Sequence, residues 1–144
     1  SYSSGQPLTV TTSGIDPAAL GFLGSSASGA RPDMIADPNS GAPQTIAKWF
    51  NTAAFAEVPT GVTRPGSAGR GVVLGPGYGR WDISLAKDIK VHEDIRFQFR
   101  AETFNIFNHT NFLTVNTTRT STQFGQVTAF RDPRLIQFGL KFYF

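Results

Sequence analysis

The chain closes on Arg134-Leu-Ile-Gln-Phe-Gly-Leu-Lys-Phe-Tyr-Phe144, and this stretch decides the fold. Read at every second position, it separates large apolar side chains from mostly polar or small ones. The apolar set is Ile136, Phe138, Leu140, Phe142 and Phe144. Because successive side chains of a β-strand point to opposite faces of a sheet, the pattern predicts a strand with one apolar face.

The last residue, Phe144, is itself aromatic, and this position is informative. In a soluble protein, a terminal Phe at the end of a strand would fray into water. In a transmembrane β-barrel the outer face of the last strand lies in lipid, and its aromatic end lies in the girdle at the membrane interface. The closing stretch therefore favours an all-β chain of antiparallel, transmembrane-barrel strands.

Two earlier stretches, residues 80–90 and 95–101, alternate in the same way. Lys87 interrupts the apolar side of the first, and beyond Glu102 the alternation changes phase, which predicts a bulge or the rim of the sheet. The apolar sides are expected to face lipid, or other copies of the chain in an assembly. Together with the closing strand they comprise Trp81, Ile83, Leu85, Ile95, Phe97, Phe99, Ile136, Phe138 and Leu140.

The opposite sides of these stretches carry charges of both signs. In a barrel this face lines the lumen, where inward charges pair across neighbouring strands or meet a plug, a structural role. The residues expected there are Asp82, Asp88, Arg96, Arg100 and Glu102.

The connections set the topology. A turn of about four residues, Val91–Asp94, joins the two alternating stretches, and long segments lie on either side. Barrels have short periplasmic turns and long extracellular loops. The chain is therefore divided into a short strand over residues 1–12, a long Gly/Pro/Ser-rich, extracellular-type loop region over 13–80, and the last three or four barrel strands over 81–144.

Within the long loop region, two short helical turns are expected, at Asp16–Gly21, where Asp16 caps the turn, and at Thr45–Phe50. Farther along the chain, a short strand is expected at Phe124–Phe130. Aromatic residues in the loop are expected to form a small core that orders it. They are Phe22, Trp49, Phe50, Phe55 and Tyr78.

Composition excludes several classes of function. The net charge is +3 without a run of basic residues, so nucleic acid is not an expected partner. The chain has no cysteine, hence no disulfide or thiolate chemistry. His92 and His109 fall in different connections, so no shared metal site is expected. No serine lies in a nucleophile-elbow motif, and neither enzymatic activity nor a cofactor is expected.

Several motifs resemble one family. Gln137-x-Gly139-x-x-Phe142-x-Phe144 resembles the C-terminal signal by which outer-membrane barrels are recognised for insertion. The stretches 75–87 and 97–108 resemble the last strands of TonB-dependent receptors. The stretches 49–55 and 133–138 are most similar to large Oar-like receptors with a carboxypeptidase-regulatory-like N-terminal domain.

This resemblance implies a bacterial outer-membrane location and energy-coupled uptake of a substrate. Such receptors have a plug and roughly twenty-two strands, of which this chain could hold only the last few. The implied partners are the remaining barrel strands, the plug and outer-membrane lipid.

Three or four strands cannot close a barrel, and open sheet edges expose unpaired backbone groups. Two alternatives therefore remain open. A released receptor-like fragment could exchange strands with copies of itself and form an extracellular filament at the cell surface. A soluble β-sandwich binding module would also use alternating strands.

Overall fold

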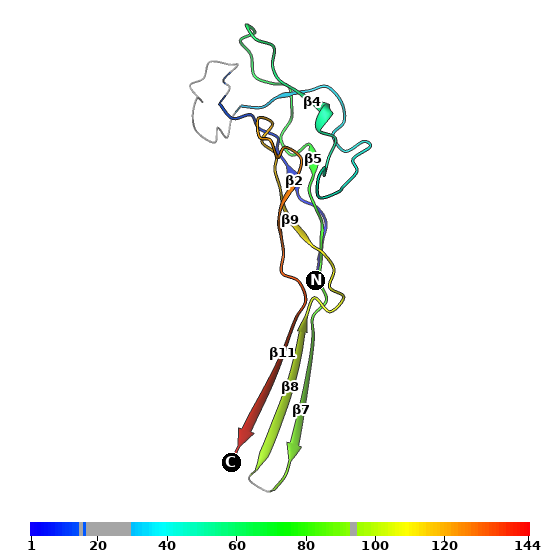
Figure 1. Cartoon of the computed structure of the whole chain (residues 1–144), viewed down its shortest axis with the longest axis vertical. Coiled ribbons are helices and arrows are strands. Elements are labelled where there is room, and N and C mark those ends of the chain that lie inside the picture. Colours follow the sequence, from blue (N-terminus) through cyan, green and yellow to red (C-terminus); the bar gives the residue numbers. More distant parts are fainter. Residues whose placement is uncertain (15, 17–29, 93–94) are drawn as a thin grey trace. The chain divides into compact units, whose positions relative to one another are not determined.

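The computed structural model describes residues 1–14, 16, 30–92 and 95–144 (Figure 1). The chain divides into two compact units. We call Ser1–Ser3, Tyr78–Asn111 and Arg131–Phe144 the strand unit, and Ser4–Gly77 with Phe112–Phe130 the loop unit. Across the described residues, no helix is long and apolar enough to cross a membrane.

The strand unit is built on one three-stranded antiparallel sheet in the order β11-β8-β7 (Figure 1). Its strands are β7 (Ile83–Lys90), β8 (Arg96–Phe104) and β11 (Leu135–Tyr143). The register runs without a shift along both pairs of strands. The predicted all-β, antiparallel fold is confirmed.

The change of phase that the sequence shows after Glu102 marks the end of the sheet and not a bulge. The side chains of β8 alternate between the two faces up to Phe104, where the strand ends. The next residue, Asn105, has a left-handed backbone conformation with φ 53°. The short strand β6 (Tyr78–Gly79), just before β7, pairs antiparallel with β1 (Tyr2–Ser3) at the start of the chain. Here the sequence predicts a single strand over residues 1–12; the structure has β1 and a second two-residue strand, β2 (Pro7–Leu8).

The described residues of the loop unit form three two-stranded antiparallel sheets. They pair β2 with β5 (Val73–Leu74), β3 (Asp33–Met34) with β4 (Phe55–Ala56), and β9 (Phe112–Val115) with β10 (Val127–Phe130). One short 3-10 helix, η1 (Thr52–Ala54), precedes β4. The predicted strand at Phe124–Phe130 begins three residues later, at Val127, and its partner β9 was not predicted.

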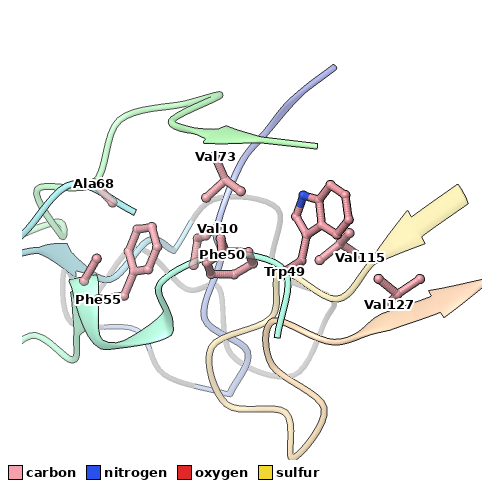
Figure 2. Close-up of a cluster of buried hydrophobic side chains, with 9 residues drawn as sticks. Val10, Trp49, Phe50, Phe55, Ala68, Val73, Val115 and Val127 are labelled. Carbon is pink, nitrogen blue, oxygen red and sulfur yellow. The ribbon is translucent and has the colours of Figure 1, made fainter. Parts of the chain in front are cut away.

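A compact apolar core holds the loop unit together (Figure 2). Phe50, only 1% exposed, meets Phe55 and Phe124 edge-on, with ring centroids 5.9 and 5.2 Å away. The indole Nε1 of Trp49 donates to the carbonyl oxygen of Leu74 at 2.9 Å, so the buried ring has its polar partner. The loop is therefore ordered by its aromatic residues.

Three other predictions for the long loop region differ from the structure or fall outside the described residues. The predicted turn at Asp16–Gly21 lies outside the described residues except for Asp16, and Phe22 lies outside them too. The stretch Thr45–Phe50 contains bends rather than a helical turn. Tyr78 belongs to the strand unit.

Candidate functional site

One face of the sheet is apolar along its length except at Lys87 and Thr103. The register pairs residues of β7, β8 and β11 in rows across the sheet, and alternate rows share a face. The side chains of this face are exposed or half-buried, with Phe138 72% and Leu140 69% exposed. The apolar face consists of Ile83, Leu85, Lys87, Ile89, Phe97, Phe99, Ala101, Thr103, Ile136, Phe138, Leu140 and Phe142.

Aromatic side chains lie at both ends of this face. At one end Trp81 meets Phe107 edge-on, with ring centroids 6.3 Å apart. At the other end the ring of Phe142 lies 4.8 Å from Phe97 and 5.6 Å from Phe144. Membrane barrels place aromatic girdles at both edges of their apolar band.

The length of the band matches a membrane. The register covers the rows from Ile83 to Phe142, and one further step to Trp81 at one end and to Phe144 at the other gives about 34 Å along the strands, at about 6.8 Å for every two residues. At a strand tilt of about 40° this gives a height of about 26 Å, against about 25 Å for the apolar band of an outer-membrane barrel. The sheet can therefore cross the hydrocarbon layer.

Two residues predicted for this face lie outside the strands. Trp81 precedes β7, and Ile95 belongs to the turn before β8. The backbone N–H of Ile95 donates to the carbonyl oxygen of His92 at 3.2 Å, and its own carbonyl accepts from Val91 at 3.0 Å. The turn is therefore tight, although Glu93 and Asp94 lie outside the described residues.

The opposite face of the sheet is mostly polar, and two of its carboxylates have side-chain partners on it. The guanidinium Nε of Arg100 lies 2.8 Å from Glu102 Oε1, and the side chain of Gln137 donates to the other oxygen of Glu102. The side-chain amide of Gln98 on β8 donates to Asp88 on β7 at 3.0 Å. Four of the five predicted inward residues, Asp88, Arg96, Arg100 and Glu102, lie on this face within the strands.

The fifth, Asp82, lies at the end of the sheet where β7 begins and β8 ends, which we call the rim. Its carboxylate contacts Arg80 Nε at 2.6 Å and accepts from the backbone N–H of Asn105 at 2.9 Å. Asp82 therefore ties the start of β7 to the end of β8.

Two buried asparagines complete the rim, and sequence reasoning missed both. Asn105 exchanges hydrogen bonds with His109, its Nδ2 donating to the carbonyl oxygen and its Oδ1 accepting from the N–H, each at 3.0 Å. Asn111 does the same with Gly79, at 2.8 and 2.9 Å. Each side chain is 3% exposed and satisfies backbone groups that would otherwise be unpaired.

A pocket of about 420 Å³ opens at the rim. Phe104 and Leu135, which pair across β8 and β11 in a row of the polar face, form its apolar part. The guanidinium of Arg80 lies 5.2 Å from the centroid of the Phe104 ring. The remaining lining residues are Asp132, Pro133 and Arg134.

In the loop unit an ion pair between Asp33 and Arg64 joins two distant segments. Asp33 accepts from Arg64 at 2.7 and 2.6 Å through both carboxylate oxygens, and from the backbone N–H of Ser67 at 2.9 Å. The Arg64 guanidinium, followed by that N–H, holds the pKa of Asp33 well below its ordinary value.

The predicted insertion signal lies on both faces of β11. Gln137 and Gly139 are on the polar face, opposite Glu102 and Arg100, while Phe142 is on the apolar face and Phe144 follows the strand. A Cβ at Gly139 would lie 3.9 Å from the Cβ of Arg100, an ordinary contact. Packing within this sheet therefore does not require a glycine there.

The sequence predicts no shared metal site for His92 and His109, and the structure gives the positions of both. His109 lies at the rim, with its ring Nδ1 3.3 Å from the side-chain oxygen of Asn111. His92 lies in the turn between β7 and β8. Within the described ranges, no three His, Asp or Glu side chains gather in a metal-binding arrangement.

Comparison with protein families gives one result. A family model described as an outer membrane beta barrel domain matches residues 1–137. Comparison with curated proteins and with solved structures finds no match.

Proposed function

The chain belongs to the outer-membrane β-barrel family, and from this premise we propose that it forms the last strands of a TonB-dependent, Oar-like receptor that takes up a substrate. The protein is located in the bacterial outer membrane. One observation supports the proposal most: an uninterrupted antiparallel sheet with one apolar face and one face that carries charges of both signs. In the proposed receptor the first face meets lipid and the second lines the lumen.

The free edges of the sheet support a larger barrel. Among the described residues, β7 and β11 each pair on one side only. Unpaired backbone groups within lipid are costly, so both edges need further strands. We propose that the remaining strands of the receptor fill these edges, and that a plug lies within the water-filled lumen that the polar face lines.

The receptor type is supported by the sequence motifs and by the ordered loop unit. The resemblance at 49–55 includes Phe50 and Phe55, two residues of the loop-unit core. In this proposal the loop unit is an extracellular structure of the receptor, and no residue in it is assigned a catalytic role. Energy coupling would then come from TonB acting on the plug.

A single set of preparations tests the proposal. Cells producing the polypeptide that carries this chain are fractionated, and the purified full-length protein, plug included, is mixed with the periplasmic domain of TonB. We expect the protein in the outer-membrane fraction, with slower migration after heating, and binding to TonB. An outer-membrane barrel that does not bind TonB would contradict the receptor type alone.

The same free edges favour a second candidate, a self-assembling fragment. In that case β7 or β11 would pair with another copy, and the apolar face would be buried between subunits. Light scattering and negative-stain imaging of the isolated chain, prepared without detergent, separate the candidates. Regular filaments would replace the receptor proposal, and a soluble monomer would indicate a β-sandwich module; solubility only in detergent supports the receptor.

A further inference from the structure

Lys87 is the one charged residue on the apolar face within β7, β8 and β11. The register places it opposite Phe99, in the row that also contains Leu140. Its neighbours along the same face of β7 are Leu85 and Ile89. The side chain is exposed, and it takes no part in the ion pairs found among the described residues.

A charge on the lipid side of a barrel is unfavourable near the middle of the membrane and tolerated near its edges. Lys87 lies two residues before Ile89, whose row holds the aromatic pair Phe97 and Phe142. That row is about 7 Å away along the strand, or about 5 Å in height at a tilt of about 40°. An extended lysine side chain reaches about 6 Å from its Cα. Its ammonium group can therefore reach the level of the aromatic row.

The turn between β7 and β8 indicates toward which side of the membrane the Lys87 side chain extends. The aromatic row lies next to the tight turn between β7 and β8, and short turns lie on the periplasmic side of outer-membrane barrels. At this level the lipid presents phosphate groups. An ammonium group binds phosphate as a compact point charge while its four-carbon stem stays in contact with apolar neighbours.

We propose that Lys87 is a phospholipid-binding residue, which holds the phosphate of an anionic phospholipid in the periplasmic leaflet. The inference rests on the proposed function, because it requires the apolar face to lie in lipid. A carboxylate of a partner protein has the same charge complementarity. Lipid is favoured because the neighbours Leu85, Ile89 and Phe99 offer no polar rim of the kind that surrounds a protein interface.

Native mass spectrometry of the intact barrel, titrated with phosphatidylglycerol, tests this proposal. Lys87→Met keeps the apolar stem and removes the charge. Lys90→Met, three residues on and on the polar face of the same strand, is the matched control. We expect Lys87→Met to weaken binding of the tightest phosphatidylglycerol roughly five- to tenfold, with Lys90→Met unchanged. Lys87→Arg should retain binding, and inorganic phosphate at equal concentration should not displace the lipid.

The outcomes are distinguishable. Equal phosphatidylglycerol binding by Lys87→Met and the unchanged barrel, in a protein that is heat-modifiable and membrane-located, would overturn the inference and leave the proposed function standing. Loss of a co-purifying protein in Lys87→Met, with lipid binding unchanged, would assign the residue to a protein partner instead. A polypeptide that does not enter the membrane would overturn both proposals.

Discussion

At the scale of single residues, the rim depends on side chains that replace backbone partners. Asn105 ends β8 with a positive φ and bonds to both backbone groups of His109. Asparagine tolerates the left-handed region better than most residues, so its identity is explained once the backbone is known. The sequence contains six asparagines, however, and local pattern does not mark these two; the contact of Asn111 with Gly79 spans 32 positions. Neither role follows from local pattern.

Replacing Asn105 separates its two contributions. Asn105→Ala loses both hydrogen bonds and the tolerance of positive φ, whereas Asn105→Gly loses the hydrogen bonds alone. We expect Asn105→Ala to lower the free energy of unfolding by about 2–3 kcal/mol and Asn105→Gly by about 1 kcal/mol less. Urea unfolding of the barrel in detergent measures both. Equal stability of the two variants would contradict the role of backbone conformation.

Asp33 predicts a pH dependence of the loop unit. Its folded-state pKa lies below the ordinary value of 3.8, so the unfolded chain takes up the proton first as the pH falls. The ion pair with Arg64 therefore stabilises the folded loop unit fully above about pH 5, and this contribution is lost as the pH falls below about 4.

Hydrogen exchange at residues 33–34 and 55–56, between pH 7 and pH 3, measures this effect after correction for intrinsic rates. We expect protection in the unchanged protein to approach that of Asp33→Asn as the pH falls. Asn39→Ala, which removes a neutral hydrogen-bonding side chain of the same unit, is the control and should keep its difference from the unchanged protein at every pH. A constant difference for Asp33→Asn would refute the assignment.

At the scale of elements, the long strands could be predicted because one apolar face imposes a period of two. The stretches read from sequence at 80–90, 95–101 and 134–144 correspond to β7, β8 and β11. The two-residue strands of the loop unit show no such period, since a repeat of two cannot be seen in fewer than three residues. The strand β9 lies in a Thr-rich segment, and its pairing with β10 includes register shifts. The rim pocket joins segments far apart in sequence and could not be predicted.

Neighbouring positions of β11 test the two faces directly. Phe138 lies in the middle of the apolar face, opposite Ala101, and Gln137 lies on the polar face beside Glu102. We expect Phe138→Arg to destabilise the membrane-inserted barrel by about 2–4 kcal/mol, the cost of a charge on the lipid face. Gln137→Arg places the same charge next to a carboxylate and should cost well under half as much. Chemical unfolding from lipid vesicles compares them, and equal costs would contradict the facing of the sheet.

At the scale of the whole molecule, two units have separate bases of stability. The strand unit buries little within itself, as expected for a surface that meets lipid and further strands, while the loop unit has its own apolar core. Sequence predicted that aromatic residues order the loop. It could not identify Val10, Val73, Val115 and Val127 as their partners, because those contacts join distant segments.

Truncating the centre of the loop core should therefore affect one unit only. Phe50→Ala removes a ring that is 1% exposed and should destabilise the loop unit by about 3–5 kcal/mol. We expect faster proteolysis within residues 30–77 and unchanged heat-modifiable migration of the barrel. Ile46→Ala, at a residue 53% exposed, is the control and should resemble the unchanged protein. A loss of membrane insertion in Phe50→Ala would show that the units do not fold independently.

The most direct test of the central claim is a cysteine scan along β8 in intact outer membranes. The chain has no cysteine of its own, so each introduced thiol is read without background from this chain. Cysteines at Gln98 and Arg100 should react with a water-soluble maleimide, and cysteines at Phe99 and Ala101 should not, because lipid covers that face. Labelling that fails to alternate along the strand, or that is equal at Phe99 and Arg100, would contradict a membrane-spanning sheet with one lipid face and one lumen face.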